Sequence, residues 1–158
     1  MRIDPVDHRV PEIARQLHAV QMSAYAQEAR LLGAVYFPPL ERTVEEVQAS
    51  AEGFVAAIVG GKIVGAISVL PDEEGMGVTI ASLVVAPQFQ RRGIGRALMA
   101  VVLQAHESEG LTVQTGVKNL PALALYQEVG FVELRRWLVG REPLELIKLR
   151  RTASTTSS

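Results

Sequence analysis

The chain has 158 residues, a length typical of one domain of about 100–200 residues. Apolar residues make up 48% of it and charged residues 21%, which is ordinary for a globular protein and argues against intrinsic disorder. The net charge is −1, so the overall charge favours neither nucleic acid nor a membrane as a partner. The absence of cysteine excludes disulfides, thiolate metal sites and a cysteine nucleophile.

The spacing of the histidines argues against a metal-binding protein, and the lengths of the apolar runs argue against a membrane-spanning or secreted one. His8, His18 and His106 stand far apart in the sequence, so we expect no metal site. No apolar run reaches the roughly 18 residues of a membrane span, and residues 1–11 lack the apolar core of a signal peptide. We therefore expect a cytoplasmic protein.

The first part of the chain predicts two helices. Apolar residues recur at helical spacing over residues 10–30, and the two prolines within 33–40 end that pattern in a shaped loop. Thr43 and Glu46 have the spacing of a capping box, which predicts a short helix over about 44–51.

A meander of strands follows. The apolar runs 53–59 and 62–70 flank Gly60 and Gly61, which is the pattern of a β-hairpin. After an acidic turn, residues 78–85 are almost wholly apolar, which is typical of a strand buried on both faces.

The second part of the chain alternates helices and strands. Helices are expected over about 93–109, ended by Gly110, and from the capping residue Asn119 to about Val129. The remaining predicted strands are 111–115, 131–139 and 144–149. The order β, α, α, β, β, β, α, β, α, β, β predicts a single α/β domain over 1–149, with a mixed sheet of about seven strands and four helices on both faces. The polar tail 150–158 is expected to be frayed.

A basic loop with glycines joins the strand 78–85 to the next helix. Arg91, Arg92 and Arg96 lie within six residues of one another, and the nearby glycines allow a ligand to approach the backbone. Because backbone N–H groups at a helix start bind anions, we expect a diphosphate here. The Walker pattern is absent, as are the third glycine and the later acid of a dinucleotide fold. A loop that only turns the chain is the alternative.

Two motifs in this region resemble those of the GCN5-related N-acetyltransferases. Residues 90–95 read Q-x-x-G-x-G, which is similar to the acetyl-coenzyme A motif of that family. Residues 119–131 read N-x-x-A-x-x-x-Y-x-x-x-G-F, which is similar to its later helix motif. The two motifs and their spacing extend the resemblance over about residues 78–131.

The resemblance implies acetyl-coenzyme A as co-substrate, an amine acceptor as partner and no metal. It implies that the strand 78–85 splays from 111–115, with its backbone binding the pantetheine arm and the loop amides binding the pyrophosphate. From the residues alone, Asn119 could be only a helix cap and Tyr126 only a core aromatic. The implied cofactor-binding residues are Leu83, Val84, Val85, Gln90, Arg91, Arg92, Gly93, Ile94, Gly95, Arg96, Asn119 and Tyr126.

The resemblance further implies direct transfer of an acetyl group to a primary amine, with Tyr126 as proton donor to the leaving thiolate. The strand 78–85 holds no Asp, Glu or His, unlike family members that carry a catalytic carboxylate there. Glu28 is our predicted substitute base, with a solvated surface charge as its alternative role. Glu41, Glu133 and a water relay stay open as bases. Without efficient transfer, the same fold would serve as an acyl-coenzyme A sensor.

The acceptor and the oligomeric state are less constrained. Tyr36 and Phe37 indicate a partly apolar acceptor pocket. The acceptor amine could belong to a small molecule, an aminoglycoside-like drug or a protein. The two apolar C-terminal strands could leave an open sheet edge, which would allow a homodimer.

Overall fold

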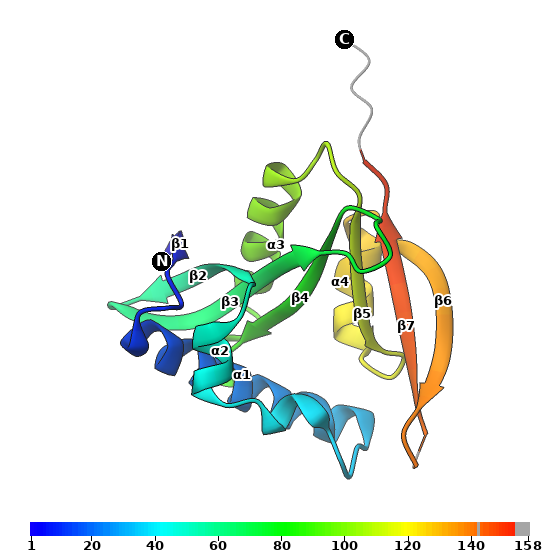
Figure 1. The fold of residues 1–158 in the computed structure, drawn as a ribbon, viewed down its shortest axis with the longest axis horizontal. Coiled ribbons are helices and arrows are strands. Elements are labelled where there is room, and N and C mark those ends of the chain that lie inside the picture. Colours follow the sequence, from blue (N-terminus) through cyan, green and yellow to red (C-terminus); the bar gives the residue numbers. More distant parts are fainter. Residues whose placement is uncertain (142, 154–158) are drawn as a thin grey trace.

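The fold is built on one mixed sheet, in a computed structural model that describes residues 1–141 and 143–153. Within these residues, seven strands are ordered β1-β2-β3-β4-β5-β7-β6 (Figure 1). The strands are β1 (Arg2–Val6), β2 (Gly53–Val59), β3 (Lys62–Pro71), β4 (Val78–Val85), β5 (Leu111–Gly116), β6 (Val132–Val139) and β7 (Leu144–Arg151). The helices are α1 (Pro11–Leu32), α2 (Val44–Ala49), α3 (Ile94–Ala105) and α4 (Leu120–Glu128), with short 3-10 turns at Pro38–Glu41 and Pro87–Phe89. The predicted α/β architecture is confirmed.

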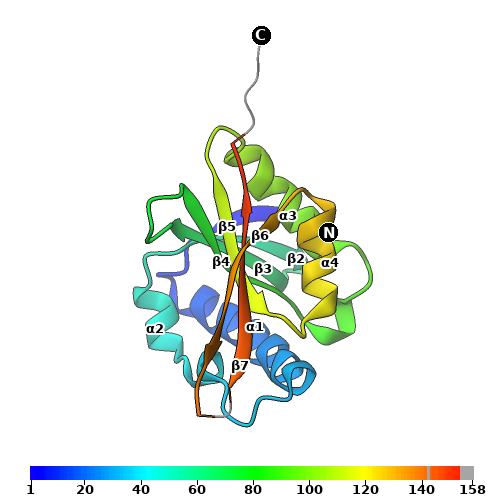
Figure 2. The same ribbon diagram turned by 90° about the vertical axis from the view of Figure 1, so that its right-hand side faces the viewer.

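The helices cover both faces of the sheet, as Figure 2 shows. On one face, Leu17 of α1 packs in a buried cluster with Ala66 of β3 and Val84 of β4. On the other face, Leu98 and Met99 of α3 belong to a second buried cluster, which also includes residues of α4 and β7. The sheet is thus the middle layer between two cores.

Two local predictions are confirmed by geometry. The Thr43 hydroxyl accepts from the Glu46 N–H, and the Glu46 carboxylate accepts from the Thr43 N–H, each at 3.1 Å. Gly60 and Gly61 have φ of 58° and 76°, the left-handed pair that a tight hairpin between β2 and β3 requires.

Gly110 does not cap α3, which ends at Ala105 instead of the predicted 109. Gly110 instead lies where the β3–β4 turn touches the start of β5. Its carbonyl oxygen accepts from the Val78 N–H at 2.9 Å, and a Cβ on Gly77 would lie 2.2 Å from that oxygen. Gly110 is therefore a glycine because two backbones approach each other closely there. The sequence alone could not distinguish this cause from the end of a helix.

The predicted start of the C-terminal tail was also wrong. Strand β7 continues through Arg150 and Arg151, which pair with β5. The Arg151 guanidinium also donates to the Val129 carbonyl oxygen at 2.9 Å. The last part of the predicted tail, 154–158, lies outside the described residues.

Strands β4 and β5 are paired over only a short stretch. Their parallel ladder joins residues 78–80 to 111–113 and goes no further along either strand in the described residues. In Figure 1 the rest of β4 leads away from β5. The expected splay between these strands is therefore present, and it leaves backbone groups of β4 without a strand partner on that side.

A buried ion pair lies at the closed end of this splay. Lys148 of β7 donates to the Asp72 carboxylate at 3.0 Å, and each side chain is only 3% exposed. Thr112 of β5 donates to the same carboxylate at 2.7 Å. Burial disfavours the ionised carboxylate, but the hydrogen bonds from Thr112 and Lys148 outweigh it and lower the pKa of Asp72 to about 2. These side chains tie the β3–β4 turn to β5 and β7.

Candidate active site

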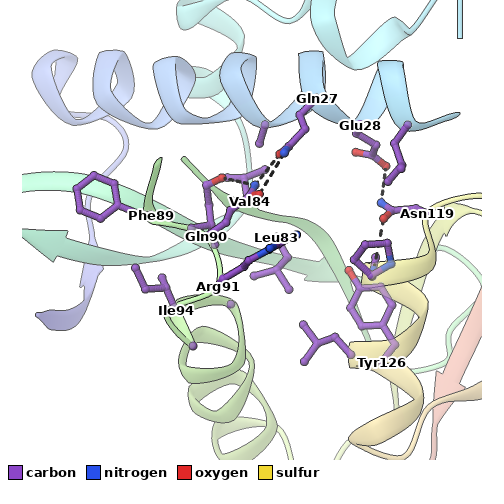
Figure 3. Close-up of a pocket in the computed structure, with 18 of the residues that line it drawn as sticks. Gln27, Glu28, Leu83, Val84, Phe89, Gln90, Arg91, Ile94, Asn119 and Tyr126 are labelled. Carbon is purple, nitrogen blue, oxygen red and sulfur yellow. Dashed lines mark hydrogen bonds between the residues drawn. The ribbon is translucent and has the colours of Figure 1, made fainter. Parts of the chain in front are cut away.

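A cavity of about 800 Å³ lies between α1, the splayed end of β4 and the start of α3 (Figure 3). This volume is within the roughly 300–1,000 Å³ of small-molecule sites. Its walls come from α1, β4, the β4–α3 loop, α3 and α4. They are formed by Ala24, Gln27, Glu28, Arg30, Leu31, Leu83, Val84, Val85, Phe89, Gln90, Arg91, Gly93, Ile94, Gly95, Asn119, Pro121, Ala122, Leu125 and Tyr126.

Most of the residues proposed from the sequence meet at this cavity, including Glu28 and Tyr126. Arg92 and Arg96 are the two that do not line it. The Arg92 guanidinium lies 5.1 Å from the centre of the Phe89 ring, and Arg96 forms an ion pair with Glu128 of α4. Among the three arginines of the loop, only Arg91 borders the cavity directly.

The backbone of β4 faces the cavity through alternate residues. The Ala86 N–H donates to the Val64 carbonyl oxygen of β3 at 2.8 Å. Because neighbouring residues of a strand turn their N–H and C=O groups to opposite sides, Leu83 and Val85 direct theirs away from β3, toward the gap. In agreement, the Val85 carbonyl oxygen accepts from the Gln90 side chain at 3.2 Å.

The loop before α3 is shaped as an anion cradle. Arg91 and Gly93 have φ of 64° and 79°, and such left-handed turns gather successive N–H groups into a concave nest. The first intrahelical bond of α3 runs from the Ala97 N–H to the Gly93 oxygen, so the N–H groups of 94–96 precede it. These donors and the positive end of the helix dipole suit a diphosphate.

A pair of glutamines joins α1 to this loop. Gln27 donates to the Gln90 side-chain oxygen at 3.1 Å, and Gln90 donates back to Gln27 at 2.6 Å. Sequence analysis missed Gln27 because it lies 63 residues from its partner and stands outside both motifs. The pair holds the side chain of Gln90 against α1.

Glu28, Asn119 and Tyr126 gather at the opposite end of the cavity, as Figure 3 shows. Asn119 caps α4 by accepting from the Ala122 N–H at 3.3 Å, and its amide also donates to Glu28 at 3.4 Å. Burial raises the pKa of Glu28, although the bond from Asn119 opposes this. Burial, and secondarily the charge of Glu28, raises the pKa of the Tyr126 phenol. This end of the cavity thus holds a carboxyl group of increased basicity beside a phenol that stays protonated.

The alternative bases lie elsewhere. The Glu41 carboxylate accepts from Tyr36, which is exposed, and Glu133 pairs with Arg136 on β6. Neither carboxylate lines the cavity. Phe37 packs edge-on against Tyr25 of α1, with ring centres 6.3 Å apart. Of the two aromatic residues expected near the acceptor, Phe37 therefore lies against α1 and Tyr36 faces solvent.

Residues 1–141 and 143–153 offer neither a cluster of metal ligands nor a membrane-spanning helix. No group of three or more His, Asp or Glu side chains in that part of the chain could hold a metal ion. No helix within the same residues has the length and apolar character needed to cross a membrane.

Comparison with known proteins gives several matches. The model of the acetyltransferase (GNAT) family matches residues 16–131. The protein YqkA of Bacillus subtilis is 40% identical over 131 residues, which cover 82% of this chain and 37% of YqkA. The peptidyl-lysine N-acetyltransferase YiaC of Escherichia coli is 41% identical over 71 residues, which cover 45% of this chain and 44% of YiaC. The aligned parts thus span less than half the length of these two relatives.

The fold comparison agrees with the family match. The ribosomal-protein-S18-alanine N-acetyltransferase of Escherichia coli superposes with a TM-score of 0.76 at 18% identity, covering 99% of this chain and 96% of that one. At this identity the likeness concerns the fold. Since the family match covers most of the sequence and the architecture agrees, the chain belongs to the acetyltransferase (GNAT) family.

Proposed function

We propose that this chain transfers an acetyl group from acetyl-coenzyme A directly to a primary amine. The observation that carries the proposal is that one cavity joins an anion cradle at one end to the Glu28, Asn119 and Tyr126 cluster at the other. Two proteins similar to it are named as acting on a peptidyl lysine and on an alanine. A primary amine is the chemistry that these acceptors share.

The backbone of this chain would hold the coenzyme. The outward N–H and C=O groups of Leu83 and Val85 suit the amides of the pantetheine arm, as a short additional strand would. The loop amides of 91–96 suit the pyrophosphate. The Asn119 side chain already bonds both Ala122 and Glu28, so its contact with the pantetheine would be an additional one.

The side chains at the far end of the cavity would handle protons. Acetyl-coenzyme A supplies a thioester carbonyl that a neutral amine can attack, with the thiol as leaving group. An alkyl ammonium has a pKa of about 10.4, so it must lose a proton first. Glu28, whose pKa burial raises, would bind the ammonium and take that proton. Tyr126, kept protonated by burial, would donate a proton to the departing thiolate.

Release of coenzyme thiol on incubation with amines tests the function. The panel contains spermidine, an aminoglycoside, a lysine peptide and a peptide with a free N-terminal alanine. We expect thiol release with at least one of them and a mass increase of that amine by one acetyl group. Calorimetric binding of coenzyme A without release on any amine would favour the acyl-coenzyme A sensor instead.

Gly95→Asp should weaken coenzyme A binding by at least about tenfold, or ~1.4 kcal/mol. A Cβ at this position meets only Val85 and Leu125, at 3.9 and 4.0 Å, so the new side chain fits and adds a negative charge to the cradle. Calorimetry with coenzyme A measures the loss. Ala100→Asp adds the same charge to the exposed face of α3 and should bind normally. Equal affinities of the two variants for coenzyme A would indicate that the loop only turns the chain and does not bind the coenzyme.

Glu28→Gln should lower turnover with amine while leaving the affinity for coenzyme A unchanged. The amide keeps the size of the side chain and removes the group proposed to bind and deprotonate the ammonium. Initial rates over a range of amine concentrations measure the effect. Glu12→Gln makes the same change on the exposed start of α1 and is the control. Wild-type amine kinetics in Glu28→Gln would leave Glu28 with no part in binding or deprotonating the amine.

Three further expectations stay predictions. Strand β6 is an edge of the sheet and exposes Val132 and Leu138, which supports a homodimer through that edge. The other two are a cytoplasmic location and a single domain, whose predicted end at residue 149 is moved by strand β7 to at least Arg151.

A further inference from the structure

Arg91 has a strained backbone conformation at the start of the anion cradle. Its φ is 64°, and among residues 1–141 and 143–153 no other residue except glycine has a positive φ. Residues with a Cβ avoid this left-handed region because the Cβ comes too close to the following carbonyl oxygen. Such strain persists only where the surrounding structure enforces it. Contacts with the rest of the chain must therefore hold Arg91 in this conformation.

Arg91 and Arg92 do not supply these contacts themselves. In the part of the chain that the structure describes, the N–H and C=O groups of both residues form no backbone hydrogen bond. The Arg91 side chain is exposed and has no hydrogen bond or ion pair with any of the described residues. The contacts that hold the turn are therefore made by its neighbours. Gly93 on one side begins α3, and Gln90 lies on the other side.

The side chain of Gln90 anchors the turn on its N-terminal side. Both hydrogens of its NH2 group are used, one for the Val85 carbonyl oxygen at 3.2 Å and one for the Gln27 side-chain oxygen at 2.6 Å. The Gln90 side-chain oxygen accepts from Gln27 at 3.1 Å. Because the Val85 carbonyl can only accept, it fixes the orientation of the Gln90 amide and, through it, that of Gln27. Figure 3 shows the three bonds, which join the residue before Arg91 to β4 and α1.

Gln27 is the part of this anchor that lies outside the segment from β4 to α3. It makes two of the three bonds, and the third joins Gln90 to a residue only five positions earlier. Gln27 belongs to α1, a helix of 22 residues whose inner face packs in a buried cluster with β3 and β4. This packing makes α1 a firm support. Without Gln27, the Gln90 side chain would keep a single bond within its own segment.

We propose that Gln27 is a positioning residue for coenzyme binding, because through Gln90 it holds Arg91 in the left-handed conformation of the anion cradle. The inference rests on the proposed function and gives a task to a residue outside both sequence motifs. While Arg91 is held, the N–H groups of 91–96 face one site before the ligand arrives. If the loop relaxes, the affinity falls in proportion to the fraction of molecules that keep the cradle.

Gln27→Met removes the amide and keeps an unbranched side chain of similar length. We expect it to raise the Kd for coenzyme A about tenfold, since a cradle present in roughly a tenth of the molecules binds with a tenth of the affinity. Calorimetry with coenzyme A measures this Kd. Gln104→Met makes the same change on the exposed face of α3 and should bind as the wild type does.

Two changes at Arg91 separate the backbone conformation from other effects of Gln27. Arg91→Ala and Arg91→Gly both remove the guanidinium, but only glycine takes positive and negative φ about equally. In the Arg91→Ala background, Gln27→Met should again raise the Kd about tenfold. In the Arg91→Gly background it should raise the Kd only about twofold, because a released loop would keep the cradle in roughly half of the molecules. A contact that only joins α1 to the loop would have the same effect in both backgrounds.

Two results would overturn the inference. One is an unchanged affinity of Gln27→Met for coenzyme A, and the other is an equal loss in the Arg91→Ala and Arg91→Gly backgrounds. Urea unfolding verifies that each variant is folded, and Gln27→Ala takes the place of Gln27→Met if that variant does not fold. A wild type that binds coenzyme A but acetylates no amine would refute the proposed transfer and leave this test intact. A wild type without affinity for coenzyme A would refute both.

Discussion

Tyr126→Phe should lower turnover with an amine by about 10²–10⁴-fold, the usual contribution of a general acid. The change removes one hydroxyl and keeps the ring, whose centre lies 5.7 Å from that of Phe131. The packing around the ring and the affinity for coenzyme A should therefore be unchanged. Stopped-time assays of thiol release, with the affinity for coenzyme A measured separately, distinguish the loss of chemistry from the loss of binding.

The pH profile gives a second measurement on Tyr126. Burial raises the pKa of its phenol above the usual value of about 10, so the wild-type rate should fall only above that pH. In Tyr126→Phe this high-pH limb should be absent. Tyr36→Phe removes an exposed hydroxyl and should behave as the wild type. Full turnover and an unaltered profile in Tyr126→Phe would assign the proton donor to water or to another side chain.

Lys148→Met should destabilise the fold by about 3–5 kcal/mol, as expected when one partner of a buried ion pair is removed. The Asp72 carboxylate would keep its bond from Thr112 but lose the cation that compensates it. Urea unfolding measures this as a lower midpoint with an unchanged slope. Arg135→Met breaks a more exposed pair with Glu74 and should cost at most about 1 kcal/mol.

The same ion pair predicts the response to acid. The pKa of Asp72 is about 2 in the folded chain, below the roughly 3.9 of an unfolded aspartate. Its stabilising contribution is thus complete above about pH 4 and is lost as the pH falls toward 2. In Asp72→Asn the stability should be lower at neutral pH and should change less over that interval. A parallel fall of both proteins would place the acid-sensitive group elsewhere.

Sequence predicted those parts of the fold that depend on local rules. The hairpin at Gly60 and Gly61 and the cap at Thr43 involve residues within a few positions of each other, and both were placed correctly. The end of α3 was misplaced because Gly110 serves a contact with Gly77, 33 positions away along the chain. Local patterns carry no information about such an approach.

The candidate site, like the fold, could be predicted where its residues are close together in the sequence and not where they are far apart. The loop and helix motifs pointed to residues that the fold brings to one cavity, because each motif is contiguous in the chain. The bond between Asn119 and Glu28 joins residues 91 positions apart, and only the resemblance, not a pattern, brought Glu28 into consideration. Gln27 was missed, since its hydrogen bonds to Gln90 join residues 63 positions apart.

The three-residue ladder between β4 and β5 has a consequence for the thermodynamic stability of the folded chain. On the proposed function, a ligand in the gap would complete hydrogen bonds that neither strand supplies, and it would bind only the native state. Such a ligand adds RT ln(1 + [L]/Kd) to the stability, about 2.7 kcal/mol when its concentration is 100 times Kd. The thermal midpoint would then rise with the supply of coenzyme, so the abundance of folded protein in a cell would follow that of its own co-substrate.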